Sequence, residues 1–490
     1  MFTRRDFLRK SLTGACALTA WGIPGVQAVL RGLPSTAAEG AAKKKILILG
    51  AGLAGMSAAL ELLSAGHDVT ILEANTYPGG RVHTLRAPFS DGLFAEAGAA
   101  RIPDWHDLTR RYIKDFGLET ESFRPSTGKN VLHLRGKRYV LAPGEDLPLA
   151  DLPFEFSADE RKLNAGDLEA KYIDPVLKNI GDPRSPGWPS PEYAKLDSLT
   201  WEEALRQRGA SQGAIDFMVA LSGFEEDSAL DFFRDDLGHR GAKFLSRIPG
   251  GNDRLPYALA AKLARKITYG AEVVKIQQNA GAVQVKFRQA GLLKDISSSR
   301  VICTIPFSVL RHLEVSPHFS APKQEVVEKL YMDPVVRVFA QTRRRFWEDE
   351  GLTGWASTDD PLDIWQPTFS QPGPRGILHT YVMDGLTLRL SKMSPEDRIR
   401  HSLDSMRRCF PQLPEHLETT YQWCWGDQPY ARGAYTVFNA GQLVPWSKIA
   451  REPEGRIHFA GEHASAFPGW MQGAFESGLR VAHDVHTAQD

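Results

Sequence analysis

The chain has 490 residues, of which 42% are hydrophobic and 24% are charged, and its formal net charge is zero. The length allows two domains or one domain with a large insertion, and the charge balance gives no electrostatic reason to expect a nucleic acid or an anionic membrane as a partner. The cysteines, Cys16, Cys303, Cys409 and Cys424, form no CxxC pair and have no zinc-like spacing. We therefore predict neither a disulfide framework nor a metal site.

Residues 1–42 differ in composition from the rest of the chain. A charged start with two arginines at residues 4–5 precedes an apolar run, rich in Ala and Gly, at residues 12–29. The run is too short and too often broken by glycine to span a membrane, and the segment resembles a twin-arginine (Tat) export signal and its linker. We expect the Tat export machinery as a partner, cleavage after Ala28 or near Ala37, and a periplasmic or extracellular location. An uncleaved basic anchor is the alternative.

A strand–helix–strand unit follows this segment. The apolar run 46–49 leads into the glycine motif GAGLAG at residues 50–55, apolar residues then recur at helical spacing as far as Gly66, and a second apolar run, 69–72, ends at Glu73. This order of elements, with an acid after the second strand, is typical of dinucleotide binding. We expect the helix N-terminus to face the phosphates and Glu73 to accept the ribose hydroxyls.

The glycines of the motif have separate roles. Gly50 permits the tight turn, Gly52 lets the backbone approach the pyrophosphate, and Gly55 lets the helix meet the strand. The motif alone does not distinguish NAD from FAD. A Gly-Gly-Arg loop at residues 79–81 follows the acid, and such a loop can fold over the pyrophosphate and place a guanidinium on it.

Three parts of the chain resemble the flavin amine oxidase family, which includes monoamine, polyamine and L-amino-acid oxidases. They are residues 46–84, the strand-like run 271–276, and the C-terminal segments 456–463 and 469–478. The resemblance implies an α/β fold in which a Rossmann-like FAD-binding domain, assembled from discontinuous segments, is joined to a substrate-binding α+β domain. The expected boundaries are 43–115, 245–310 and 441–490 for the FAD-binding domain and 116–244 and 311–440 for the substrate-binding domain.

The resemblance implies FAD as the cofactor, bound without a covalent link because Ala434 stands where covalent monoamine oxidases have the cysteine that is attached to flavin. Val273 aligns with the valine that contacts adenine. A helix that begins near Met471 places its N-terminus near the flavin and favours hydride acceptance by roughly 1 kcal/mol; the alternative is a packed strand and helix without a ligand. The residues expected to bind FAD are Gly50, Gly52, Leu53, Ala54, Gly55, Glu73, Ala74, Gly80, Arg81, Gly98, Ala99, Ala100, Arg101, Val273, Trp425, Glu462, Gly469, Trp470, Met471, Gln472 and Ala474.

Arg101 is the main candidate for substrate recognition. It lies in the stretch EAGAARIP at residues 96–103, which is similar to the context in which L-amino-acid oxidases hold the arginine that binds the substrate α-carboxylate. A guanidinium in a dry pocket matches a carboxylate bidentately, and two charged hydrogen bonds discriminate against a simple amine by roughly 10²- to 10⁴-fold. The alternative is an arginine on the surface or on an FAD phosphate.

Aromatic residues complete the expected substrate site. Tyr435 and Trp470, with Gly469 beside the latter, align with the two aromatics that flank the amine in monoamine oxidases. Opposed ring faces orient a neutral amine or hold an apolar side chain, although either ring alone is also typical of a core. L-amino-acid oxidases hold a tyrosine beside the carboxylate, and at that place this chain offers Gln366 or Trp365.

Two charged features need separate interpretation. Arg337 stands where the family usually has a lysine that holds a water near flavin N5 and helps oxygen to react. Arginine keeps the positive charge but is no practical proton donor, so we assign Arg337 a catalytic role and leave open a slow reaction with oxygen. The acidic residues between positions 225 and 236 are expected to be solvated rather than to face a basic substrate side chain.

We therefore predict an FAD-dependent oxidoreductase that acts on the CH–NH₂ group of L-amino acids. Hydride passes from the α-carbon to flavin N5, the imine hydrolyses to a 2-oxo acid and ammonia, and molecular oxygen reoxidises FAD and yields hydrogen peroxide. The expected partners are a small-molecule amino acid or amine and oxygen, and a homodimer is one assembly that the sequence leaves open. The alternatives are a monoamine or polyamine oxidase of the same fold, a flavin dehydrogenase with a quinone or protein acceptor, and an exported protein whose flavin is structural.

Overall fold

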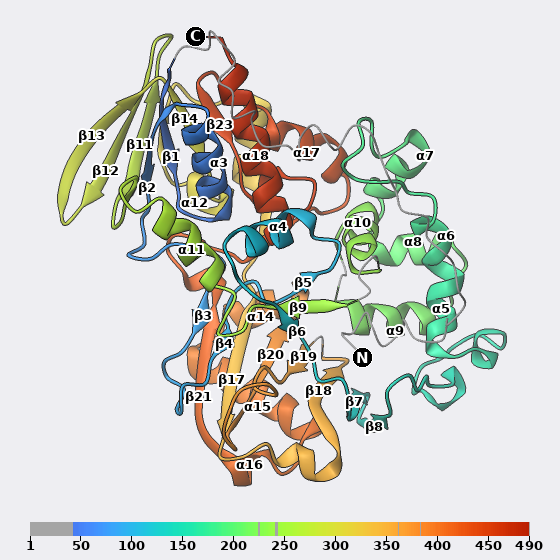
Figure 1. The fold of residues 1–490 in the computed structure, drawn as a ribbon. Coiled ribbons are helices and arrows are strands. Elements are labelled where there is room, and N and C mark those ends of the chain that lie inside the picture. Colours follow the sequence, from blue (N-terminus) through green and yellow to red (C-terminus); the bar gives the residue numbers. More distant parts are fainter. Residues whose placement is uncertain (1–42, 224–225, 241–243, 361, 383, 490) are drawn as a thin grey trace.

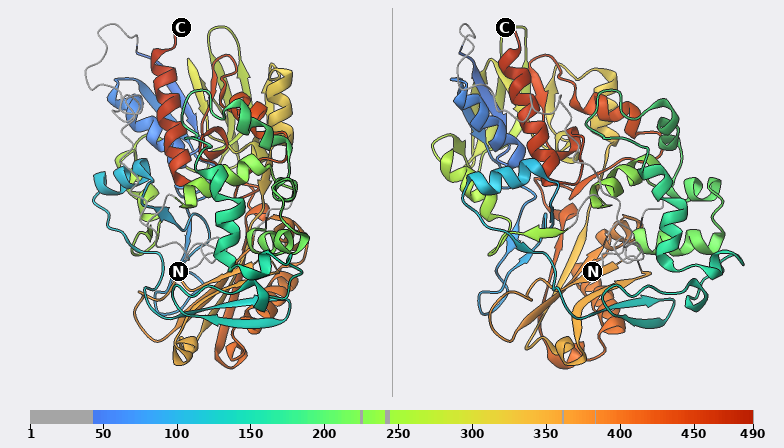
Figure 2. Two further views of the ribbon diagram at one scale, coloured as in Figure 1. Left: turned by 90° about the vertical axis from the view of Figure 1, so that its right-hand side faces the viewer. Right: turned by 45° about the vertical axis from the view of Figure 1, so that its right-hand side comes forward.

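The computed structural model describes residues 43–223, 226–240, 244–360, 362–382 and 384–489. The predicted export signal and linker lie outside these ranges. A parallel sheet and a larger, mostly antiparallel sheet lie at opposite ends of the molecule, with a group of helices to one side (Figure 1, Figure 2). The predicted α/β class is confirmed. In the described part of the chain, no helix is both long enough and apolar enough to cross a membrane.

A five-stranded parallel sheet leads into the predicted glycine motif. Its strand order is β10-β2-β1-β14-β23, and every neighbouring pair is parallel. Its strands are short and almost entirely buried, as expected where a parallel sheet is covered on both faces. They come from segments that are far apart in the sequence, namely β1 (Lys45–Leu49), β2 (Asp68–Leu72), β10 (Ile267–Thr268), β14 (Arg300–Cys303) and β23 (Ile457–Phe459).

The helices α3 (Leu53–Ser64) and α18 (Met471–Thr487) pack against each other beside this sheet (Figure 1). Small residues allow the close approach. A Cβ added at Gly478 would lie 2.3 Å from Oγ of Ser57 and 2.4 Å from the carbonyl oxygen of Ala54. The contact brings the first and the last helix of the described chain together.

A second sheet and several helices flank the parallel sheet. The sheet has the order β13-β12-β11-β15, and β15 pairs with β11 although it lies in the stretch 311–440 that we expected in the other domain. The division of the chain into two domains stays a prediction. The bounds are β11 (Glu272–Gln278), β12 (Val283–Gln289), β13 (Leu292–Ser298), β15 (Glu314–Ser316), α4 (Asp107–Asp115), α11 (Arg254–Lys262), α12 (Phe307–Leu310), α13 (Ala321–Lys329) and α17 (Leu443–Arg451).

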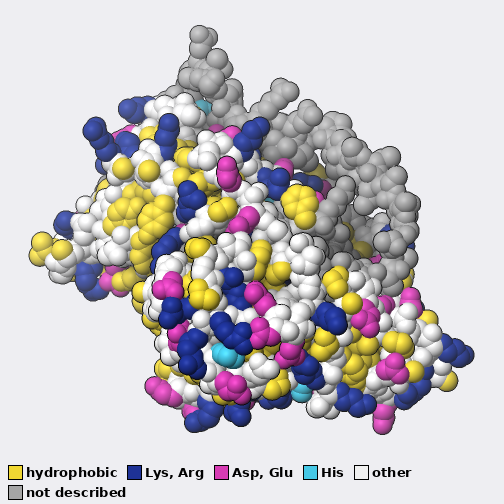
Figure 3. Space-filling model, turned by 60° about the horizontal axis from the view of Figure 1, so that its bottom comes forward, with side chains coloured by type: hydrophobic (Ala, Val, Ile, Leu, Met, Phe, Trp, Pro, Cys, Tyr) yellow, Lys and Arg dark blue, Asp and Glu magenta, His cyan; other side chains and the backbone are white. Residues whose placement is uncertain are grey.

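The seven-stranded sheet has the order β21-β17-β20-β19-β18-β7-β8, and β18 and β7 are its parallel pair. The helix α15 (Pro395–Cys409) packs against it. Lys or Arg and Asp or Glu side chains are interspersed over the lower face of the molecule (Figure 3). The strands are β7 (Lys129–Leu134), β8 (Lys137–Leu141), β17 (Val336–Thr342), β18 (Leu352–Thr358), β19 (Leu362–Trp365), β20 (Gly376–Val382) and β21 (Leu417–Cys424).

Helices from the middle of the chain form the group at the side (green in Figure 1 and Figure 2). Stacked aromatic rings stabilise it, since the ring centroids of Trp201 and Phe232 are 3.7 Å apart. Its helices are α5 (Ala165–Tyr172), α6 (Asp174–Leu177), α7 (Pro191–Ala194), α8 (Trp201–Gln207), α9 (Gln212–Ser222) and α10 (Ala229–Arg240). The described chain also forms three smaller sheets. Two of them are strand pairs, β3 (Thr84–Leu85) with β4 (Ala95–Glu96) and β16 (Tyr331–Asp333) with β22 (Tyr435–Val437). In the third, β9 (Leu245–Arg247) lies between β5 (Ile102–Pro103) and β6 (Glu121–Ser122).

Candidate active site

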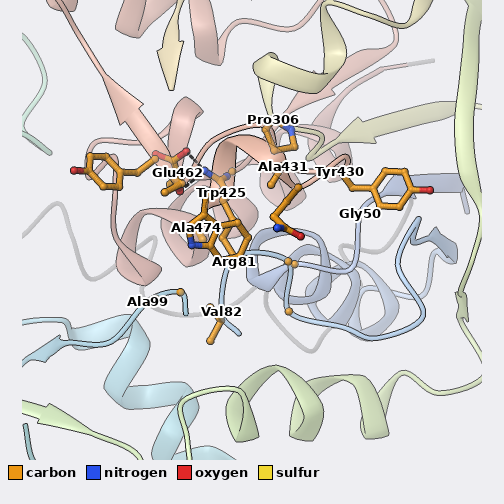
Figure 4. Close-up of a pocket in the computed structure, with 18 of the residues that line it drawn as sticks. Gly50, Arg81, Val82, Ala99, Pro306, Trp425, Tyr430, Ala431, Glu462 and Ala474 are labelled. Carbon is orange, nitrogen blue, oxygen red and sulfur yellow. Dashed lines mark hydrogen bonds and ion pairs between the residues drawn. The ribbon is translucent and has the colours of Figure 1, made fainter. Parts of the chain in front are cut away.

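A cavity of about 610 Å³, the central cavity, is lined by residues from the parallel sheet, the N-terminus of α18 and the seven-stranded sheet. Figure 4 shows that Gly50, Arg81 and Glu462, which lie far apart in the sequence, meet at it. Most of the residues predicted to bind cofactor or substrate line this cavity, namely Gly50, Gly52, Leu53, Ala54, Glu73, Ala74, Gly80, Arg81, Gly98, Ala99, Ala100, Arg101, Val273, Arg337, Trp425, Tyr435, Glu462, Gly469, Trp470, Met471 and Ala474.

Three predicted residues do not line the cavity. Gly55 lies under the glycine turn, where an added Cβ would be 2.1 Å from the carbonyl oxygen of Gly50, so it serves the contact of helix and strand. Gln472 accepts hydrogen bonds through Oε1 from the backbone amides at the start of α4, those of Leu108 and Thr109, both at 3.1 Å. Gln366 is fully buried outside the cavity, and Trp365, the other candidate at that place, lines it instead.

Glu73 ties the end of β2 to the glycine turn. Its Oε2 accepts a hydrogen bond from the amide of Ala51 at 2.6 Å, and its Oε1 accepts one from the amide of Asn75 at 2.8 Å. Burial raises the pKa of Glu73, although these amides favour the charged form. The helix α3 begins after Gly52 without a side-chain cap, so its first amides are suited to an anionic group. The donors and the acid fit the pyrophosphate and ribose of a dinucleotide.

Arg81 and Glu462 form an ion pair across the cavity wall (Figure 4). Nη1 of Arg81 lies 2.5 Å from Oε1 of Glu462 and donates a second hydrogen bond to the carbonyl oxygen of Ala434 at 3.0 Å. The other carboxylate oxygen accepts from the amide of Gly469 at 2.9 Å. Burial alone would raise the pKa of Glu462, but Arg81 and the surrounding donors lower it below its usual value. Glu462 is therefore held as an anion that fixes the loop before α18.

The N-terminus of α18 opens on the same cavity. Its first residue follows Trp470, which provides no side-chain cap, and both Met471 and Ala474 line the cavity. Gly473 allows the preceding loop to approach, because an added Cβ would lie 2.1 Å from the carbonyl oxygen of Phe467. Uncapped amides at a helix start stabilise negative charge, so this end fits a ring system that gains electrons. Ala434 lines the cavity and has no side-chain atom for a covalent link.

Aromatic rings surround Arg101 at the other end of the cavity. Its guanidinium carbon lies 5.2 Å from the ring centroid of Trp365, 5.7 Å from that of Tyr381 and 5.5 Å from that of Trp470. Among the described residues, the structure shows neither an ion pair nor a hydrogen bond for this guanidinium. A half-buried cation held by ring faces at a cavity is suited to receive an anion.

The two predicted aromatic walls are held by carboxylates. The hydroxyl of Tyr435 donates to Oδ2 of Asp333 at 3.1 Å, and Nε1 of Trp470 donates to Oδ1 of Asp235 at 2.9 Å. The ring of His106 also meets that of Trp470 edge-on, at 4.9 Å between centroids. These contacts fix both rings at the cavity, which Tyr435 and Trp470 both line, and their predicted place beside the substrate amine stays a prediction.

Sequence reasoning missed Tyr381 and misjudged the acidic stretch. Tyr381 is a buried residue of β20 with no motif around it, so no local signal marked it. The acids of α10 were expected to be solvated, but Asp231 and Asp235 line the cavity and Asp236 is buried. The helical spacing of Asp231 and Asp235, four residues apart, was the available signal, since such residues lie on one helix face.

Residues 53–486 match the family described as flavin containing amine oxidoreductase. The chain is 34% identical over 457 residues to the putative L-amino-acid oxidase YobN of Bacillus subtilis (strain 168), which covers 90% of this chain and 95% of that protein. It is 29% identical over 465 residues to the L-amino-acid oxidase of Echis ocellatus, and the match covers 91% of this chain and 90% of that protein. Among solved structures, a putrescine oxidase variant with a redesigned cofactor site has the same fold, with a TM-score of 0.77 and 23% sequence identity. The match covers 90% of this chain and 98% of that chain.

Proposed function

Because the chain belongs to the flavin-containing amine oxidoreductase family, we propose that it oxidises L-amino acids at the bond between the α-carbon and the amino nitrogen. The cofactor is FAD, for which the glycine turn, Glu73 and the N-terminus of α18 provide a fitting site. Water and molecular oxygen complete the balance, since an L-amino acid, oxygen and water give a 2-oxo acid, ammonia and hydrogen peroxide.

The observation that carries the choice of substrate is Arg101. Its guanidinium lies at the cavity among three aromatic rings, without a carboxylate partner in the described residues. A substrate α-carboxylate supplies that partner, whereas a simple amine leaves the charge unpaired in a poorly solvated site. The names of the relatives from Bacillus subtilis and Echis ocellatus support the same choice.

Bound FAD supplies a two-electron acceptor for the hydride of the α-carbon. The chain itself positions the substrate. Arg101 binds the carboxylate and so selects which face of the α-carbon is presented, while Tyr435 and Trp470 flank the amine and exclude water. The N-terminal amides of α18 stabilise negative charge at the reacting end of the cavity. No side chain needs to act as a base if the amine enters neutral.

The test is reduction of the protein-bound flavin without oxygen by L-amino acids, D-amino acids, the decarboxylated amines and polyamines. The expected result is bleaching by L-amino acids alone. The second-order rate constant for flavin reduction should be roughly 10²- to 10⁴-fold lower in Arg101→Ala, because two charged hydrogen bonds are lost. Arg265→Ala, at an exposed position away from the cavity, is the control with the same change of side chain. Bleaching by L-amino acids that survives Arg101→Ala would overturn the role of Arg101.

A second candidate is a monoamine or polyamine oxidase, favoured by the likeness in fold to putrescine oxidase. It requires that amines without a carboxylate bleach the flavin at least as well as L-amino acids do. In a separate assay in air with the same substrates, formation of peroxide decides between oxygen and another electron acceptor. If bleaching is fast and peroxide is slow, Arg337 in place of lysine is the first residue to replace.

We also propose export by the Tat pathway to the periplasm or the outside of the cell, supported by the twin arginine at residues 4–5 and the apolar run after it. Replacing both arginines by lysine should keep the flavoprotein in the cytoplasm. Activity measured in cell fractions tests this, and unchanged export of the lysine variant would contradict it.

A further inference from the structure

Two guanidinium groups share one pair of aromatic rings in the central cavity. The guanidinium carbon of Arg337 lies 5.4 Å from the ring centroid of Trp365 and 4.7 Å from that of Tyr381. That of Arg101 lies 5.2 and 5.7 Å from the same two centroids. The distances to Tyr381 place the two guanidinium carbons no more than 10.4 Å apart. Both side chains line the same cavity, so both can contact a ligand that binds in it.

Arg337 is a buried cation for which no described residue supplies an ion-paired carboxylate. Its Nη1 donates to the carbonyl oxygen of Glu96 at 2.7 Å, and its buried Nε has no hydrogen-bond partner. Burial, together with repulsion from Arg101, lowers the pKa of Arg337 to about 10 despite the opposing effects of Tyr381 and of the Glu96 carboxyl group, which forms no ion pair with it. A buried charge without an ion-paired partner is costly, and repulsion by the second cation, Arg101, adds to the cost.

Two other arginines at the cavity are paired with carboxylates, and a third, Arg432, is exposed and contacts His312 at 3.2 Å. Arg81 pairs with Glu462, and Arg234 pairs with Asp231. The acids at the aromatic end are engaged elsewhere, since Asp333 accepts from Tyr435 and Asp363 accepts from Ser357 at 2.8 Å. At the Trp365 and Tyr381 end of the cavity, Arg101 and Arg337 are therefore two positive charges for which no described residue supplies an ion-paired carboxylate, and a ligand with two negative charges complements them.

We propose that Arg337 is a second anion-binding residue and that the preferred substrates are L-amino acids with a carboxylate side chain. The α-carboxylate binds Arg101, and the side-chain carboxylate binds Arg337. In a bidentate pair the carboxylate carbon lies about 4 Å from the guanidinium carbon, and the carboxylate carbons of glutamate are about 5 Å apart at most. A bent aspartate or glutamate can thus bridge two guanidinium groups whose carbons are separated by no more than the upper limit of 10.4 Å. The inference rests on the proposed function and names its substrate class.

The test uses pairs of substrates that match in shape and differ in charge. For the FAD-loaded protein, kcat/KM should favour L-glutamate over L-glutamine, and L-aspartate over L-asparagine, by about 10- to 100-fold, as one charged hydrogen-bonded pair provides. Arg337→Met should lower kcat/KM for L-glutamate and L-aspartate by about 10- to 100-fold more than for their amides and so abolish the preference, whereas Arg101→Met should lower kcat/KM for all four substrates. Arg337→Lys, which keeps the charge and loses the bidentate fork, should give an intermediate preference.

Binding of glutarate, which has no amine to oxidise, provides a readout apart from activity. Glutarate should perturb the absorption spectrum of the bound flavin at lower concentration than butyrate does, and Arg337→Met should remove the difference. Equal use of glutamate and glutamine, or an equal loss on all four substrates in Arg337→Met at full FAD content, would overturn the inference and would place Arg337 elsewhere in the reaction. If no L-amino acid reduces the flavin, the proposed function fails, and the glutarate result still decides whether Arg337 binds an anion.

Discussion

Glu96 is a buried carboxyl group that should make folding stability depend on pH. The Oγ1 of Thr84 donates to its Oε2 and the amide of Asn252 donates to its Oε1, both at 2.8 Å. Burial outweighs these donors and raises the pKa of Glu96 from 4.5 to about 7. The folded state therefore binds the proton more tightly than the unfolded state. The stabilisation of the folded state by this proton is complete below about pH 4.5 and is lost as pH rises through about 7. The free energy of unfolding changes by about 3 kcal/mol over this range.

Replacing Glu96→Gln removes the titration and keeps an oxygen for the amide of Asn252. The free energy of unfolding, measured by urea denaturation with saturating FAD, should fall in the wild type relative to the variant by about 3 kcal/mol between about pH 4.5 and pH 8. Glu119→Gln, at an exposed position, is the matched control and should follow the wild type. Parallel pH profiles for the wild type and Glu96→Gln would refute the reasoning, because burial of the carboxyl would then not control its protonation.

Three further predictions concern the contact between α3 and α18, the hydrogen bond between Glu73 and Ala51, and the contacts of Lys323 with the end of α17. Gly478→Ala should destabilise the protein by about 1–3 kcal/mol in thermal unfolding, because the new Cβ meets the backbone of Ala54, and an unchanged midpoint would contradict the packing of α3 on α18. Glu73→Gln should weaken FAD binding about tenfold in a titration of the apoprotein, because the charge that accepts from the amide of Ala51 is lost; equal affinity would remove Glu73 from the cofactor site. Lys323→Met should lower the free energy of unfolding by about 1–3 kcal/mol in urea denaturation, because Nζ of the lysine donates to carbonyl groups at the end of α17. An unchanged free energy of unfolding would mean that water satisfies these carbonyl groups in the variant.

The cofactor end of the site is predictable from the sequence because its chemistry lies in short contiguous stretches. The glycine turn, the acid after β2 and the loop before α18 each combine fixed spacing with a local backbone requirement. The ion pair of Arg81 with Glu462 was not predictable, since 381 positions separate the two residues. The sequence placed the guanidinium on the pyrophosphate and offered no sign of its carboxylate partner.

The composition of the substrate end depends on which side chains of the seven-stranded sheet point into the cavity, and tertiary structure decides this. Trp365 ends β19 and lines the cavity, while the next residue, Gln366, is buried outside it. A shift of one position along an extended chain reverses the face, so an uncertain alignment leaves both candidates open. Tyr381 is contributed by the neighbouring strand β20, and its place beside Arg101 follows from the strand order rather than from any motif.

The strand order of the parallel sheet determines when each strand pairing can form during synthesis of the chain. Among the described elements, β1 and α3 are made early, but β14 receives its second neighbour only when β23 has been made, and α3 meets α18 only when that helix has followed. Such pairings close loops of several hundred residues and are slow to form. The side of α3 that packs on α18 therefore remains uncovered until α18 has been made, and this exposed apolar surface needs chaperone protection while the intervening chain is synthesised.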